Sequence, residues 1–458
     1  MVYAHGLGPC GATHRSSSLL LGTKMDKKNC FFLCGILLLS LILHAWRIQT
    51  PKSAVFDEVH FATYATNYVA HIPFFDIHPP LGKFIFSLPL YFFSKQSLAE
   101  SPFIQLVHNT RIEYKILGRS FSNFPYIPLR AVSALFGVLL VFSTFLFVRE
   151  LTKNNTAAFL SAFFITLENS LLIETRFILL DGMFLSFSFF ALWQFLKQKD
   201  SGIYSGILWG CALATKLIGI IFLPFILFQK ESWWKKYKFI TIGFFILGTL
   251  WVGIQWFSFS TSDWYTFTKS VNTDLAQTIP QIPKNLSITE NITLKSYLLL
   301  NEVAWSTEGY TIIKDNNFGK SRWYGWPFMI GSFCYSNTTT PICLIGNPAL
   351  WALGLLAIIW TILYLIIKKM RKEKPDQKAK SLLIGYFCVL FPFAIVPRFM
   401  LIYHYFPALI FSLCLAAYWI ITYSETLEKN YRIFFYAIVV FVVCVGFLAV
   451  SPTTFGIR

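Results

Sequence analysis

The sequence predicts an all-α polytopic membrane protein, and three observations support this class. Of the 458 residues, 55% are hydrophobic and only 13% are charged, with a mean hydropathy of +0.56. Phe alone supplies 49 residues, against 22 Asp plus Glu. Apolar runs close to the length of a membrane span recur from about residue 31 to the end. This composition excludes a soluble globular domain, a disordered chain, a collagen, a coiled coil and a small disulfide scaffold.

The apolar runs predict about eleven membrane-spanning helices. They cover residues 31–46, 126–148, 156–174, 178–196, 203–215, 217–229, 238–257, 347–367, 381–397, 402–423 and 433–450. The runs at 203–215 and 217–229 are short for a hydrocarbon core of about 30 Å, so we expect these two helices to be tilted or to extend beyond their apolar runs.

The positive charges predict how the chain is threaded. With the N-terminus inside, the short inside segments hold 21 of the 39 Lys and Arg residues, and seven of these lie between Lys368 and Lys380. Cytoplasmic loops carry such an excess near span ends. We therefore expect a cytoplasmic N-terminus in the cell membrane, or in the endoplasmic reticulum membrane if the source is eukaryotic. The net charge of +17 then faces anionic lipid headgroups and does not indicate a nucleic-acid partner.

These spans divide the chain into four regions. Residues 1–30 form a cytoplasmic tail, residues 31–257 a membrane region of seven spans with an outer loop at 47–125, residues 258–346 a second outer loop, and residues 347–458 a membrane region of four spans. Residues 1–24 lack a long apolar run, and both a start at Met25 and a disordered tail fit them.

Two features place the outer loops. Residues 81–93 are apolar but short, which suits an interfacial or re-entrant segment better than a span. Three glycosylation sequons begin at Asn285, Asn291 and Asn337, which agrees with an outer position for the second loop.

Two of the nine cysteines, Cys334 and Cys343, fall in the outer loops. A disulfide between them would close a short loop and stabilise the fold by about 2–3 kcal/mol, whereas two unpaired thiols are the alternative. The sequence contains no recognisable metal-ligand motif and no glycine-rich nucleotide-binding motif. No metal site is predicted, and a nucleotide-driven pump has no support.

Acidic side chains gather in the first outer loop. Asp57 and Glu58 follow the first span, and Asp76, His78 and Lys83 follow about twenty residues later. Two neighbouring acids tend to differ in protonation, so that one can serve as a general base while the other orients a ligand. Either group alone would also suit a solvated or loop-capping role. Their concentration in one loop favours a functional site.

Basic residues recur at the outer ends of predicted helices, namely Arg130, Arg176, Lys216 and Arg398. A cation at such a depth is costly unless it meets water or an anion, and a single one is more often snorkelling or ion-paired. Four at one depth indicate a shared anion, for which a lipid phosphate is the natural candidate. A simple pairing of Asp181 with Arg176, and a packing role for His404, both stay open.

The order and spacing of these motifs resemble those of the protein O-mannosyltransferase family. The first loop carries VFDEVHF and FFDIHPPLGK, and the following spans carry FPYIPLRAVSALFG, ETRFILLDGMFLSFS and GCALATKLIGI. WYGWP, IGNPALW and PRFMLIYHYFPA resemble the family's C-terminal four-span region. The second loop, of roughly 90 residues, is too short for the MIR domain of eukaryotic members, so the chain resembles the bacterial branch.

The resemblance implies a GT-C glycosyltransferase fold and an activity. The family transfers mannose from a polyprenyl or dolichyl phosphate to Ser or Thr hydroxyls of proteins, with inversion, and needs no further cofactor. By matching positions, Asp57 is the general base and Glu58 positions the donor or acceptor. Arg130, with Lys216 and Arg398 as weaker candidates, stabilises the donor phosphate. The remaining candidates would shape the loop or line the acceptor entrance: Asp76, His78, Lys83, Arg176 and His404.

Several alternatives remain beside this reading. Another GT-C transferase, modifying a lipid or a glycan, would share Asp57 and the outer-face cations. A non-enzymatic transporter or lipid flippase would need charged residues through the bilayer centre, whereas here they gather at one face. A divalent cation near the acid pair also stays open, as does the oligomeric state.

Overall fold

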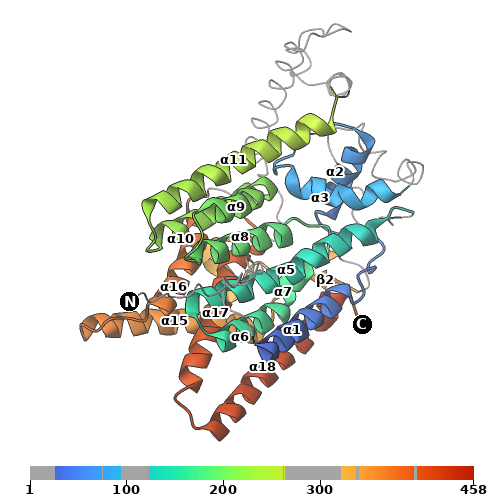
Figure 1. The fold of residues 1–458 in the computed structure, drawn as a ribbon. Coiled ribbons are helices and arrows are strands. Elements are labelled where there is room, and N and C mark those ends of the chain that lie inside the picture. Colours follow the sequence, from blue (N-terminus) through green and yellow to red (C-terminus); the bar gives the residue numbers. More distant parts are fainter. Residues whose placement is uncertain are drawn as a thin grey trace, which may run out of the picture.

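The computed structural model describes residues 26–74, 76–93, 121, 123–260, 263, 321–336, 340–396 and 400–457. These residues form a bundle of helices with one short β-hairpin (Figure 1). The predicted sequons Asn285, Asn291 and Asn337, together with Arg398 and Met25, lie outside the described residues.

The helices follow the apolar runs of the sequence. The N-terminal part comprises α1 (Lys27–Ala45), α2 (Glu58–Ala70), α3 (Leu81–Ser87), η1 (Leu88–Phe92), α5 (Tyr126–Thr152), α6 (Asn155–Thr166), α7 (Asn169–Glu174), α8 (Asp181–Leu196), α9 (Ile203–Thr215), η3 (Leu217–Phe222), α10 (Leu223–Phe228) and α11 (Trp233–Ser258). The C-terminal part comprises η4 (Trp323–Phe328), β1 (Cys334–Ser336), β2 (Ile342–Cys343), α15 (Pro348–Met370), α16 (Gln377–Leu390), η5 (Phe391–Ala394), η6 (Ile402–Tyr405), α17 (Phe406–Ser424) and α18 (Lys429–Phe455).

Within the described part of the chain, six helical segments are long and apolar enough to cross a membrane: α1, α5, α11, α15, η6 with α17, and α18. The other expected spans fall on shorter helices. The run at 156–174 is broken between α6 and α7, because the Glu168 side chain accepts the Leu171 N–H and starts a new helix there. The run at 217–229 divides into η3 and α10, with Pro224 in the first turn of α10. The count of eleven spans therefore stays a prediction.

Aromatic packing forms the centre of the bundle. α17 is the most enclosed of the six long helices, and its Phe411 ring contacts Phe147 of α5 and Phe189 of α8, each with centroids 5.6 Å apart. α11 and α18 leave most of their apolar side chains on the outside. Such surfaces suit a hydrocarbon environment, where an exposed apolar face has no cost.

A buried polar seam joins the N-terminal and C-terminal parts. The Glu168 carboxylate accepts hydrogen bonds from Ser170 Oγ and Leu171 N at 2.7 Å, and from Asn347 N at 3.0 Å and Trp351 Nε1 at 2.8 Å. The Asn347 side chain caps α15 and donates to the carbonyls of Leu167 and Val443, both at 3.0 Å. Every bond replaces one that water would make, so the seam can be buried at modest cost.

The two outer-loop segments that the structure describes lie at one end of the bundle. Figure 1 shows α2, α3, the β-hairpin and the C-terminal end of α18 at this end, which we call the hairpin end. The predicted interfacial segment at 81–93 forms α3 and η1, which pack against α2. A disulfide joins Cys334 to Cys343 and closes the hairpin.

Candidate active site

Asp57 lies at the hairpin end, directly before α2. Its side chain does not cap the helix, and the carboxylate has no hydrogen-bond partner within the residues that the structure describes. Burial raises the pKa of Asp57, while His60 and Lys216 act to lower it and the nearby Asp181 and Asp76 act to raise it. A half-buried carboxylate with a raised pKa and an open lone pair is suited to accept a proton.

Lys216 and Asp181 form a buried ion pair beside Asp57. Lys216 follows the last residue of α9, where the backbone becomes extended, and Asp181 is the first residue of α8. Lys216 Nζ lies 2.7 Å from Asp181 Oδ2 and 5.1 Å from the centre of the Tyr403 ring. The helix ends thus place a cation and two carboxylates close together at the hairpin end.

Two further side chains complete this cluster and were not singled out by sequence reasoning. Glu174, at the end of α7, is hydrogen-bonded to Asp181. Tyr335, on β1, donates a hydrogen bond from its hydroxyl to Glu174. Glu174 opens the ETRF motif and Tyr335 follows Cys334, so both stood next to residues that the sequence did mark.

Glu58 and Arg130 bind each other and the backbone of the first loop. Arg130 Nε and Nη2 each donate to Glu58 at 2.8 Å, and the remaining guanidinium hydrogens go to the carbonyls of Ile48, Pro51 and Ser53. Glu58 also accepts the N–H groups of Val55 and Ile178. Both side chains are fully buried. All five guanidinium hydrogens of Arg130 are thus engaged in this structure, and Glu58 helps to hold the loop.

Asp76, His78 and Lys83 form a separate cluster that shapes the first loop. Lys83 Nζ donates to Asp76 Oδ2 and to the His78 carbonyl, both at 2.6 Å, and is completely buried. Burial acts to raise the pKa of Asp76, but the charge and hydrogen bond of Lys83 outweigh it and the pKa is lowered. Burial lowers the pKa of His78 to about 3, so the ring is neutral near pH 7. Lys83 is thus committed to the loop.

Arg176 does not pair with Asp181. It donates to the carbonyls of Trp46 and Thr454, and its guanidinium lies 4.7 Å from the Phe455 ring. Arg176 therefore connects α18 to the residue that follows α1. Asp181 pairs with Lys216 instead.

His404 stacks on Tyr403, with ring centroids 4.4 Å apart, and its Nδ1 lies 3.0 Å from the Leu401 carbonyl oxygen. His404 also contributes to the electrostatic environment of Asp181. Of the expected phosphate ligands, the described residues therefore bring Lys216 to Asp57.

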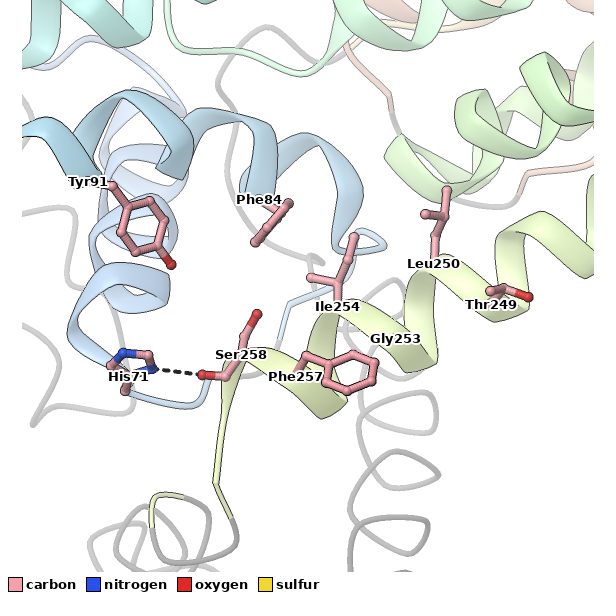
Figure 2. A pocket seen from close by; sticks show the side chains of 9 residues that line it. All are labelled: His71, Phe84, Tyr91, Thr249, Leu250, Gly253, Ile254, Phe257 and Ser258. Atoms are coloured by element: carbon pink, nitrogen blue, oxygen red, sulfur yellow. Dashed lines mark hydrogen bonds between the residues drawn. The ribbon is translucent and has the colours of Figure 1, made fainter.

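A cavity of about 360 Å³ lies at the opposite end of α2 from Asp57. Figure 2 shows that the residues lining it come from the end of α2, from α3 and η1, and from α11, with Phe84, Tyr91 and Ile254 among them. His71 at its rim lies 2.9 Å from the Ser258 carbonyl oxygen. None of the predicted site residues lines this cavity. Among the residues described, no group of three or more His, Cys, Asp or Glu side chains is placed to hold a metal ion.

The arrangement of helices resembles that of solved membrane glycosyltransferases. The Saccharomyces cerevisiae protein O-mannosyltransferase Pmt1–Pmt2 complex bound to the sugar donor superposes with a TM-score of 0.72 at 14% identity, over 95% of this chain and 91% of that one. The Archaeoglobus fulgidus oligosaccharyltransferase superposes with a TM-score of 0.56 at 12% identity, over 94% of this chain and 56% of that one. The chain thus has the GT-C fold of membrane-embedded glycosyltransferases.

Sequence comparison narrows this class to one family. A family model described as dolichyl-phosphate-mannose-protein mannosyltransferase matches residues 35–270, and a model of the C-terminal four-span region of protein O-mannosyltransferase matches residues 293–458. The first model alone covers more than half of the sequence. The chain belongs to the dolichyl-phosphate-mannose-protein mannosyltransferase family.

Individual relatives are distant. The chain is 28% identical over 221 residues to dolichyl-phosphate-mannose–protein mannosyltransferase 1 of Candida albicans, covering 45% of this chain and 24% of that protein. It is 30% identical over 220 residues to mannosyltransferase 4 of Schizosaccharomyces pombe, covering 45% of this chain and 27% of that protein. The matched segment therefore spans about a quarter of the length of these curated relatives.

Proposed function

We propose that this protein transfers mannose from a polyprenyl or dolichyl phosphate to Ser or Thr hydroxyls of proteins. The observation that carries the proposal is the position of Asp57, whose unbonded, half-buried carboxylate lies within the electrostatic reach of the Lys216–Asp181 pair. A base for the acceptor and a cation for the leaving phosphate are the two groups that this reaction needs. Family membership supplies the donor class.

The reaction is a single displacement. The acceptor hydroxyl oxygen forms a bond to the anomeric carbon, while the bond from that carbon to the phosphate oxygen breaks on the opposite face. The hydroxyl proton passes to Asp57, and the electron pair leaves with the lipid phosphate. Inversion follows because the two oxygens occupy opposite faces. Lys216 stabilises the charge that develops on the phosphate, an effect of about 3–4 kcal/mol for comparable groups.

Several finer assignments belong to the same proposal. We place the hairpin end on the extracytoplasmic side and the N-terminus in the cytoplasm, because the Lys and Arg excess lies in the loops at the other end. The segment between α11 and α15, about 90 residues long, favours a bacterial-type member without a MIR domain. Arg398, outside the described residues, stays a second candidate for the phosphate. No further cofactor enters the scheme.

The deciding experiment measures transfer of radiolabelled mannose from polyprenyl phosphate mannose to Ser/Thr-containing peptides. Membranes would carry the wild type, Asp57→Asn, or Asp26→Asn as a matched control, since Asp26 only caps α1 and Asn caps equally well. We expect transfer by the wild type and the control, and a loss of about 10²–10⁴-fold for Asp57→Asn. Equal transfer by both variants would remove Asp57 from the role of base. Label appearing in lipid or glycan and not in peptide would favour a different GT-C transferase.

A further inference from the structure

The disulfide-closed hairpin reaches into the candidate site through one side chain. Tyr335, between Cys334 and Ser336 on β1, is 4% exposed although both of its neighbours are partly exposed. Its ring stacks on that of Phe56, with centroids 4.6 Å apart and planes 16° from parallel.

Phe56 is the residue directly before Asp57, and its backbone is in the left-handed region with φ of 44°. A residue with a bulky side chain adopts this conformation only where its surroundings fix it. The surroundings here are rings: Tyr335 at 4.6 Å, Phe333 at 5.2 Å and Tyr403 at 6.1 Å between centroids. Because φ of Phe56 sets the direction in which the chain enters α2, the stack also fixes where the Asp57 carboxylate lies.

The hydroxyl of Tyr335 serves the other half of the cluster. It donates to Glu174, which is hydrogen-bonded to Asp181, the partner of Lys216. The Tyr335 ring thus contacts the residue before Asp57, and its hydroxyl is connected to Lys216 through Glu174 and Asp181.

We infer that Tyr335 is a positioning residue, which holds the candidate base Asp57 and the candidate phosphate-binding Lys216 at a fixed separation through its ring and its hydroxyl, respectively. The inference rests on the proposed function for its reaction, but the contacts are independent of it. The Cys334–Cys343 disulfide keeps Tyr335 in place, so the hairpin is a part of the site and not only a stabilising clip.

Two substitutions separate the two contacts. Tyr335→Phe removes only the hydroxyl, which acts on Lys216 through Glu174 and Asp181, and we expect kcat to fall several-fold while the labelling midpoint of Asp57 stays that of the wild type. Tyr335→Leu removes the stack, and we expect kcat to fall by about 10- to 100-fold, as a small misplacement of a reacting group does. The exposed Tyr431→Leu is the matched control and should leave kcat unchanged. The double variant Cys334→Ser, Cys343→Ser should lower kcat in the same direction as Tyr335→Leu.

A second measurement does not need turnover. Labelling of Asp57 with a water-soluble carbodiimide and an amine, followed by mass spectrometry across a pH series, reports the midpoint at which the carboxyl protonates. We expect this midpoint to fall by about half a pH unit or more in Tyr335→Leu, because Asp57 gains contact with water. This result would hold even if the wild type transferred no mannose, an outcome that would reject the proposed function alone.

A Tyr335→Leu protein that keeps both the kcat and the labelling midpoint of the wild type would overturn the inference. So would a drop in activity that merely follows the amount of folded protein, as measured by thermal unfolding, while the midpoint stays in place. A disulfide-free variant with unchanged kcat and midpoint would show that the hairpin does not hold Tyr335 in place.

Discussion

Arg130 donates to both carboxylate oxygens of Glu58, at 2.8 Å each, across 72 residues of sequence and with neither side chain exposed. The two adjacent acids, Asp57 and Glu58, thus differ in their hydrogen bonding. Glu58 accepts hydrogen bonds from the arginine and from two backbone N–H groups, whereas the Asp57 side chain does not cap the helix that follows it. One loop therefore supplies both a structural anchor and a reactive group.

This pairing predicts that Arg130→Met acts on stability. Removing one partner leaves a buried, uncompensated charge, which typically costs about 3–5 kcal/mol in the free energy of unfolding. We expect a large drop in the unfolding temperature in detergent, partly reversed in the double variant Glu58→Gln, Arg130→Met. The exposed Lys153→Met, which breaks the pair with Glu150, should change stability by less than about 1 kcal/mol. If Arg130→Met unfolded at the temperature of the wild type and lost only donor binding, Arg130 would instead be a ligand of the donor phosphate.

The raised pKa of Asp57 predicts the acidic limb of the pH–rate profile. A general base must be deprotonated, so transfer falls as the pH drops through the pKa of Asp57. Since burial raises that pKa, the fall should occur above the ordinary Asp value of about 3.9. Initial rates across a pH series would show this limb in the wild type. Residual transfer by Asp57→Asn should lack it, and the same limb in that variant would assign the titration to another group.

Lys216→Met should weaken catalysis by more than it weakens folding. The substitution leaves Asp181 buried without its partner, so some loss of stability is expected and the transfer rate is divided by the folded fraction. The loss of a cation at the developing phosphate charge is expected to lower kcat by about 10²–10³-fold. Lys235→Met is the matched control, because Lys235 is also a buried lysine in an ion pair, with Glu231, but lies near the other end of the bundle. Steady-state transfer rates at saturating donor compare the two. Equal losses in both variants would mean that burial of a lysine, and not its position, matters.

The polar seam predicts a purely structural phenotype for Asn347→Ala. The substitution removes the cap of α15 and leaves the carbonyls of Leu167 and Val443 without their donor. We expect a loss of about 2–3 kcal/mol in stability. Transfer per folded molecule should be unchanged, measured as rate divided by the folded fraction, with the partly exposed Asn29→Ala as control. A lower rate per folded molecule would instead connect the seam to the site.

The sequence predicted well what depends on hydropathy and on local motifs. The helices lie on the apolar runs, and the two outer-loop cysteines, Cys334 and Cys343, form a disulfide. The motifs of the sequence also marked Asp57 and Lys216 as candidates. Lys216 stood out because a cation between two apolar runs is conspicuous at any position.

The remainder of the site depends on pairings across long stretches of chain, which no local pattern contains. Arg130 and Arg176 look alike in sequence, as cations at helix ends, yet one meets Glu58 and the other meets backbone carbonyls of α18 and the residue after α1. Asp181 pairs with Lys216, which is 35 residues later in the sequence, and not with Arg176, which is five residues earlier. Which of several charges pair is decided by tertiary packing, so these partners could not be predicted from spacing.

The Glu168 carboxylate also imposes an order on biosynthesis. Two of its four donors, Ser170 and Leu171, leave the ribosome with it, whereas the other two, Asn347 and Trp351, are made 179 and 183 residues later. During that interval the N-terminal helices sit in the bilayer with an acid whose hydrogen bonds are half made. The hydrogen bonds of this acid can be completed only after the start of α15 has been made and has reached the N-terminal helices.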